Sequence, residues 1–189
     1  MVIELFGLPG AGKTTFAKQL EADGFTVVKI RTKKELLYFN FVHLVRHPIS
    51  SLMNAIFILK NSPNPGLRYY KFMNFFLDMN ARYEKARLYG KAVLDQGYFQ
   101  NVLSVFENPM SAEIMKRYIK HLPKPDKLIV LDILAEESLK RAGERGYYSR
   151  ERFGDEYVEN WRKVVLQNYD LFKKVVGDLG VEYEIVSNN

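Results

Sequence analysis

Residues 7–14 match the pattern G-x-x-x-x-G-K-[ST] at every fixed position, and a second threonine, Thr15, follows. An apolar run at residues 2–6 precedes them, and a helical pattern starts near Lys13. Glycines allow successive backbone N–H groups to turn toward an anion without a Cβ clash, and the helix N-terminus adds partial positive charge. The segment therefore predicts a phosphate-binding loop between a buried strand and a helix, which restricts the chain to the α/β class.

Each residue type in this loop has a predicted role. We expect the Lys13 ammonium to reach the β- and γ-phosphates of a nucleotide, and the Thr14 hydroxyl to ligate Mg²⁺. The predicted cofactors are thus ATP and Mg²⁺. The residues predicted to bind the nucleotide are Gly7, Pro9, Gly10, Ala11, Gly12, Lys13, Thr14 and Thr15.

Short β-type runs alternate with helical stretches along the chain. Strands are predicted at 25–30, 92–95, 128–132 and 181–186, and a long amphipathic helix at 155–179. This alternation predicts a three-layer fold with a mainly parallel, five-stranded sheet and helices on both faces. A length of 189 residues fits a single domain, 1–189.

Composition narrows the classes of function. The net charge of +6 favours anionic partners, and the absence of cysteine excludes disulfides, thiolate metal sites and a cysteine nucleophile. The histidines (His43, His47 and His121) have no carboxylates nearby in the sequence, so no transition-metal site is predicted. No nucleic-acid motif, signal peptide or membrane span is found, and a cytoplasmic location is expected.

Residues 36–90 interrupt the alternation and form a predicted helical insert on the acceptor side. Residues 36–77 contain no Asp or Glu but many aromatic residues, and Pro and Gly residues divide the region into helices at 49–61 and 67–88. The aromatic residues fit packing on the sheet, and they equally fit a pocket wall or a partner surface. A homodimer is one such partner.

Residues 124–132 and 136–146 resemble the PD-x-hydrophobic-LD…A-x-x-R-x-x-x-R-G stretch of thymidylate kinases and related deoxynucleoside kinases. The resemblance implies a P-loop NTPase fold with an arginine lid at 141–153. In such a lid Arg141 and Arg145 would neutralise the transferring phosphoryl group, and Arg141 would stack on the base. A solvated basic helix end is the alternative explanation.

Asp95 ends the third predicted strand, where the resemblance implies a general base or a Mg²⁺ ligand. The family's arginine after this acid is replaced by Gln96-Gly97, a pattern closer to uncharacterised bacterial P-loop kinase-like proteins. Asp132, a second candidate for the metal, is expected to be structural. The predicted catalytic residues are Lys13, Asp95, Arg141 and Arg145, and the predicted acceptor-binding residues are Arg31, Arg46, Gln96, Arg150 and Arg152.

Together these features predict an ATP- and Mg²⁺-dependent kinase that phosphorylates a small-molecule acceptor. The cations at 31–34, after the second strand, favour an anionic acceptor, whose identity the sequence leaves open. A thymidylate-like nucleoside monophosphate kinase is one alternative. A non-catalytic ATP-binding regulatory or membrane-surface module is another: a pocket at Asp95 would favour the enzyme, and an exposed aromatic patch would favour the module.

Overall fold

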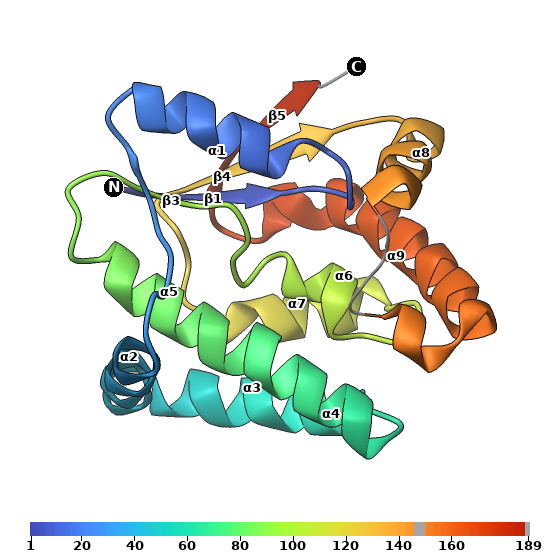
Figure 1. The fold of residues 1–189 in the computed structure, drawn as a ribbon, viewed down its shortest axis with the longest axis horizontal. Coiled ribbons are helices and arrows are strands. Elements are labelled where there is room, and N and C mark those ends of the chain that lie inside the picture. The colour runs from blue at the N-terminus through green and yellow to red at the C-terminus, as the bar shows by residue number, and fades with distance from the viewer. Residues whose placement is uncertain (146–149, 188–189) are drawn as a thin grey trace.

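The computed structural model describes residues 1–145 and 150–187 and contains one five-stranded parallel sheet. The strand order is β2–β3–β1–β4–β5 (Figure 1). The strands are β1 (Val2–Phe6), β2 (Thr26–Val27), β3 (Ala92–Leu94), β4 (Lys127–Asp132) and β5 (Glu182–Ser187). The predicted α/β fold class is confirmed. Because β3 and β4 flank β1, the residues that follow all three strands meet at one edge of the sheet.

Helices cover both faces of the sheet. In Figure 1, α1 lies on one face, α5, α7 and α9 lie on the other, and α2 and α3 form an outer layer beyond α5. The helices are α1 (Lys13–Ala22), α2 (Lys33–Arg46), α3 (Pro48–Lys60), α4 (Pro65–Lys71), α5 (Asp78–Ala86), α6 (Asn101–Ser104), α7 (Ala112–Lys120), α8 (Ala135–Arg145) and α9 (Asp155–Val175).

The core lies mainly between the sheet and the α5–α9 layer. Phe6, at the end of β1, is fully buried and stacks on Phe172 of α9, with ring centroids 3.9 Å apart. The central strands are buried on both faces, as their continuous apolar runs predict. This packing fixes the carboxyl end of β1, and therefore the start of the phosphate loop.

Several elements differ in extent from the sequence prediction. The strand expected at 25–30 covers only Thr26–Val27, and the helix expected to reach residue 179 ends at Val175 and continues as a 3₁₀ turn, η3 (Val176–Asp178). The helix expected at 67–88 is instead continuous from α4 to α5 through a π-helical segment, η1 (Phe72–Leu77). Helices α2 and α7 were not predicted.

No single helix in the described ranges is long and apolar enough to cross a membrane. Helices α2 and α3 together satisfy the length and composition criteria, but they meet at a bend of 112°.

Candidate active site at the phosphate loop

The loop between β1 and α1 has the backbone that its glycines allow. Gly10 and Gly12 both adopt a φ of 84°, the left-handed region in which a Cβ is strained. The Lys13 ammonium turns back over the loop and donates hydrogen bonds to the carbonyl oxygens of Gly7 and Leu8, at 2.8 and 2.9 Å. The side chains of Thr14 and Thr15, in the first turn of α1, are exposed. The loop therefore has the glycine conformations expected of a phosphate-binding loop, and two exposed hydroxyl groups lie beside it.

Helix α8 packs directly against this loop. The Ser138 hydroxyl donates to the Pro9 carbonyl oxygen at 2.7 Å. A Cβ built on Gly10 would lie 2.9 Å from the Ser138 carbonyl oxygen and 3.1 Å from the Arg141 Cβ. Arg141 therefore lies beside the loop, where its Nε donates to Glu137 at 2.7 Å. The absence of a side chain at Gly10 is what permits this approach.

Gln100 fixes the first residue of the loop. Its amide accepts from the Gly7 N–H at 3.3 Å and donates to the Gly7 carbonyl oxygen at 3.1 Å, so it pairs with Gly7 much as a neighbouring strand would. Gln100 is itself buried and precedes α6. The segment after β3 is in this way attached to the end of β1.

Asp95 follows β3 and is held by an arginine from the helical insert. The Arg82 guanidinium, on α5, pairs with the Asp95 carboxylate and also donates to the Val28 carbonyl oxygen, at 2.9 and 3.1 Å. It further donates to the Gln96 carbonyl oxygen at 3.3 Å. A guanidinium is thus present at Asp95, although the arginine expected directly after this acid is replaced by Gln96.

A buried carboxyl lies beneath the turn that follows Asp95. Glu4, on β1, is fully buried and accepts a hydrogen bond from the Phe99 N–H at 2.6 Å. Burial raises the pKa of this carboxyl to about 8, against the opposing effect of the backbone N–H groups around Phe99. A Cβ on Gly97 would overlap the Glu4 carboxylate. The Glu4 carboxylate therefore leaves no room for a side chain at residue 97, which explains the glycine at this position.

A cavity of 160 Å³ opens beside the loop and brings several predicted residues together. Lys13 lies on its phosphate-loop side, Gln96 and Gln100 come from the segment after β3, and Arg150 comes from the segment after α8. Gln96 neighbours Asp95, whose side chain is 22% exposed. The complete lining is Pro9, Lys13, Tyr70, Phe75, Gln96, Gln100, Ser104, Arg150 and Trp161.

Arg150 is a buried, anchored cation rather than a freely exposed one. It donates to the Ser104 carbonyl oxygen at 2.6 Å and to Glu107 at 3.3 Å, and its guanidinium lies 4.4 Å from the centre of the Trp161 ring. Lys71 pairs with the same Glu107 at 2.5 Å, and burial lowers the pKa of Lys71 to about 8 although Glu107 opposes this shift. These contacts hold the end of the predicted lid against the helical insert.

The remaining predicted residues have different surroundings. Arg31 and Arg152 are exposed, and Arg152 lies over the Phe153 ring at 4.8 Å from its centre. Arg46 donates to Glu84 at 2.9 Å, within the insert. Asp132, on the far side of β1 from Asp95, accepts hydrogen bonds from two side chains of α9 at 2.8 and 3.1 Å. Residues 146–149 of the lid, and the side chain of Arg145, lie outside what the structure describes.

The sequence prediction did not include Arg82, Gln100 or Trp161. A signal for Gln100 was present in the sequence, since a polar residue just after a strand that neighbours β1 is placed near the loop. Arg82 and Trp161 come from helices, and their positions depend on how α5 and α9 dock.

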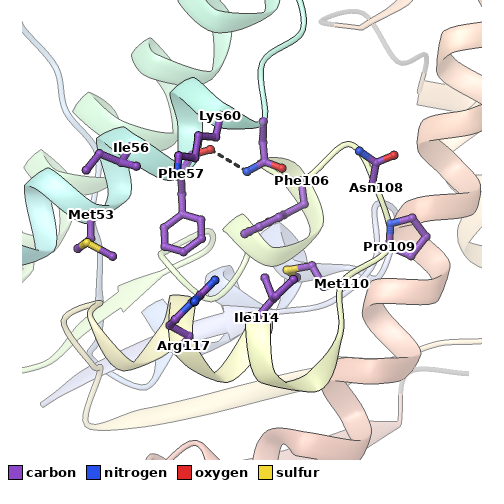
Figure 2. Close-up of a pocket in the computed structure, with 11 residues that line it drawn as sticks. Met53, Ile56, Phe57, Lys60, Phe106, Asn108, Pro109, Met110, Ile114 and Arg117 are labelled. Atoms are coloured by element: carbon purple, nitrogen blue, oxygen red, sulfur yellow. Dashed lines mark hydrogen bonds between the residues drawn. The ribbon is translucent and has the colours of Figure 1, made fainter.

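A second, larger cavity of 430 Å³ lies away from the loop, between α3 and α7 (Figure 2). Figure 2 shows Phe57 of α3 and Phe106 on its walls, with Arg117 of α7 on the opposite side. Its lining includes no residue of the phosphate loop, so the smaller cavity at Lys13 is the candidate active site.

Comparison with known proteins shows a likeness of fold. No protein-family model matches the sequence, and no curated protein matches it. The structure of deoxyadenosine kinase from M. mycoides with bound dATP aligns with a TM-score of 0.55 at 17% identity, covering 99% of this chain and 91% of that chain. A structure of the M. mycoides enzyme with the products dCMP and dCDP gives 0.53 at 17% identity, covering 98% and 90%. The chain therefore has the fold of these kinases.

Proposed function

We propose that the chain is an ATP- and Mg²⁺-dependent kinase that transfers the γ-phosphoryl group to a small molecule bound in the cavity at Lys13. The observation that carries this proposal is that one cavity is lined both by Pro9 and Lys13 of the predicted phosphate loop and by a buried arginine, Arg150. A phosphoryl group between these two cations would be neutralised from both sides, and phosphoryl transfer depends mainly on such positioning and charge.

The donor nucleotide would occupy the loop. Backbone N–H groups of residues 10–13 would hold its phosphates, and Lys13 would exchange its bonds to the loop carbonyls for bonds to phosphate oxygens. Thr14 and Asp95 would hold Mg²⁺, Asp95 through water, since both lie at the carboxyl edge of adjacent strands. When bound, Mg²⁺ would supply charge neutralisation at the β- and γ-phosphates.

The acceptor would lie between the aromatic side of the cavity and Asp95. Tyr70, Phe75 and Trp161 form an aromatic wall, while Gln96 and Arg150 offer polar contacts. Such a wall suits a flat or apolar body that carries hydroxyl or anionic groups. We favour an anionic acceptor because Arg31 and the lysines after it add exposed positive charge. The fold likeness to a deoxyadenosine kinase makes nucleosides and nucleoside monophosphates the first acceptors to test.

The segment 141–153 would act as the lid. Arg141, whose Cβ lies beside Gly10, would contact a nucleotide in the loop, and Arg150, which lines the cavity, would contact the transferring phosphoryl group. We expect amide hydrogen exchange in this segment to slow when a non-hydrolysable ATP analogue binds. Equal exchange with and without the analogue would remove the lid from the proposal.

The decisive experiment is a screen of ATP consumption against nucleosides, nucleoside monophosphates, sugars and phosphorylated metabolites. Each positive acceptor is then tested with the Lys13→Ala variant, so that phosphatase or contaminating kinase activity is separated from activity at this loop. We expect at least one acceptor whose phosphorylation requires Lys13. ATP binding without any acceptor-dependent turnover would favour the second candidate function.

That second candidate is an ATP-binding docking module, and an exposed apolar surface favours it. This surface runs along one side of α2 and across the bend into α3, and its members are 54–70% exposed: Leu37, Tyr38, Phe41, Leu44, Val45, Ile49 and Leu52. Exposed apolar patches of this kind mark interfaces. We expect a second copy of this chain to cover the surface, which is compatible with kinase activity.

Light scattering of the wild-type chain and of Phe41→Glu tests this assignment. A dimer that becomes a monomer in the variant supports the second copy. A monomeric wild-type chain that floats with anionic lipid vesicles would instead support the membrane-surface module.

A further inference from the structure

Three side chains with metal-ligating atoms converge outside the phosphate-loop cavity. His43 lies in the last turn of α2, His47 at the bend between α2 and α3, and Glu84 on α5. The Nδ1 atom of His43 and the Nε2 atom of His47 lie 3.2 and 3.3 Å from the same oxygen, Oε1 of Glu84. All three donor atoms are within 4.8 Å of one another. The sequence prediction of no such site overlooked Glu84, which lies far from the histidines along the chain.

A chain of hydrogen bonds fixes the proton on the His43 ring. The Asn40 amide nitrogen donates to two backbone carbonyl oxygens at 2.8 Å, which leaves the Asn40 oxygen as an acceptor for the Asn80 amide nitrogen at 3.2 Å. The Asn80 oxygen therefore accepts the Tyr98 hydroxyl proton. The Tyr98 oxygen, 3.0 Å from His43 Nε2, must then accept a proton that this nitrogen carries.

This assignment leaves the lone pair of neutral His43 on Nδ1, facing the Glu84 carboxylate. Two hydrogen-bond acceptors at 3.2 Å repel unless a positive charge lies between them. Among the described residues, His47 Nε2 is buried without a hydrogen-bond partner, although it lies close to the same oxygen. The two nitrogen atoms and the carboxylate oxygen are thus close together with their lone pairs unsatisfied, and a cation between them, either a proton or a metal ion, would remove the repulsion.

The types of side chain in the cluster favour ligation of a metal ion. Two imidazole nitrogens and one carboxylate oxygen are a donor set that suits a divalent transition ion.

We propose that His43 Nδ1, His47 Nε2 and Glu84 Oε1 bind a divalent transition-metal ion of the Zn²⁺ class, with a fourth position left for water. A tetrahedral ion with bonds of about 2.1 Å has donor atoms about 3.4 Å apart, close to the two separations of 3.2 and 3.3 Å. The His47 side chain as a whole is 27% exposed, so the cluster lies near the protein surface.

Two neighbours complete the arrangement around the ligands. Tyr98 holds the outer nitrogen of His43, as an oxygen acceptor commonly does for a metal-bound histidine. Arg46 donates to the other oxygen of Glu84 at 2.9 Å and leaves Oε1 for the ion. The ion would tie the α2–α3 bend to α5, the helix that carries Arg82 and thereby holds Asp95. It would therefore stiffen the acceptor side of the candidate active site.

Titration of the nucleotide-free, chelator-treated full chain with Zn²⁺ and with Co²⁺ tests the proposal. We expect one Zn²⁺ per chain by elemental analysis after desalting, a higher Tm with Zn²⁺, and the intense visible absorption of four-coordinate Co²⁺. In His47→Ala the affinity should fall at least about tenfold. This variant removes a partly exposed side chain and should fold, whereas Glu84→Gln, at a buried position, serves as a second variant.

The matched control is His121→Ala, which removes the one histidine of this sequence that lies outside the cluster. It should bind Zn²⁺ as the wild-type chain does. No stoichiometric Zn²⁺ binding by the wild-type chain, or binding that His47→Ala leaves unchanged, would overturn the proposal. The positive charge between His43 and Glu84 would then be a proton.

Discussion

The Arg82 guanidinium on α5 pairs with the Asp95 carboxylate at the end of β3, so the helical insert supplies a cation to the edge of the sheet where the phosphate loop begins. The same guanidinium donates to carbonyl oxygens of Val28 and Gln96, and it therefore links three segments around Asp95. The position directly after Asp95 is then free to hold Gln96, which lines the candidate cavity.

Replacing Arg82 should loosen this junction. We expect Arg82→Gln to lower the free energy of unfolding by about 1–3 kcal/mol, because buried carbonyl and carboxylate acceptors lose their donor. It should also reduce turnover with any acceptor found, since Asp95 loses its position. Urea unfolding measures the first effect and steady-state kinetics the second. Arg87→Gln, at the exposed position directly after α5, is the control. If both variants lost the same stability, the effect would not be due to the contacts of Arg82 with Asp95.

Lys13→Ala should weaken binding of ATP and lower turnover on the order of 10²–10³-fold, the scale for losing one preorganised electrostatic contact. The fold should survive, because the carbonyl oxygens of Gly7 and Leu8 that accept from this ammonium belong to its own loop and not to the core. Calorimetric titration with ATP and Mg²⁺ is the measurement, with the exposed Lys18 changed to Ala as the control. An unchanged affinity in Lys13→Ala would contradict the assignment of the loop.

Gly10 and Gly24 form a matched pair for testing how closely α8 approaches the loop. Both have a positive φ, 84° and 87°, but only a Cβ on Gly10 meets α8, whereas one on Gly24 meets nothing within 4 Å. Both alanine variants should lose stability through backbone strain, of about 1 kcal/mol. Gly10→Ala should lose more and also weaken nucleotide binding. Thermal unfolding and calorimetry compare the two, and equal losses would mean that the approach of α8 is not restrictive.

Glu4 predicts a pH dependence of stability with a definite sign. Its pKa is about 8 in the folded chain and near 4.5 when unfolded, so between these values the folded state binds more protons. Stability should fall as pH rises from about 5 to 8, by an amount on the order of 5 kcal/mol, and it should level off above pH 8. Glu4→Gln keeps an acceptor for the Phe99 N–H and should remove this slope. Urea midpoints across the pH range measure it, and parallel profiles for the two chains would count against a neutral Glu4.

Arg31 distinguishes the classes of acceptor. With an anionic acceptor, Arg31→Ala should raise the KM for the acceptor and leave the KM for ATP near its original value. With a neutral acceptor it should change neither. Lys33→Ala, also exposed near the start of α2, controls for general surface charge. An acceptor KM that stayed constant in Arg31→Ala would reverse our preference for an anionic acceptor.

The loop and the sheet were predictable because their signals are local. The glycines, Lys13 and Thr14 lie within residues 7–14, and strands such as β1 and β4 are short apolar runs in the sequence. The parallel order then follows from alternation with helices. Alternation alone does not give the order of the strands within the sheet, in which β3 and β4 lie on either side of β1.

The insert was less predictable because some of its aromatic residues line cavities and others are exposed on the surface. Phe75 and Tyr70 line the candidate cavity, Phe57 lines the larger one, and Tyr38 and Phe41 are exposed on α2. Composition does not show which aromatic residue lines a cavity and which is exposed, since this depends on which helix packs against each of them. The pairing of Glu84 with two histidines and of Arg82 with Asp95 has the same origin, because both partners are brought together only by the docking of α5.

The π-helical segment Phe72–Leu77 has a consequence for how this chain can diverge. A π turn holds one residue more than an α turn, so the deletion of a single residue there would restore a regular helix. It would also rotate the residues before it, Tyr70 among them, by about 100° about the helix axis relative to Arg82 and Glu84. The deletion of one codon would therefore change the direction of Tyr70 relative to Arg82 and Glu84, which follow it along the same continuous helix. Relatives that accept different molecules are expected to show a one-residue gap at this point.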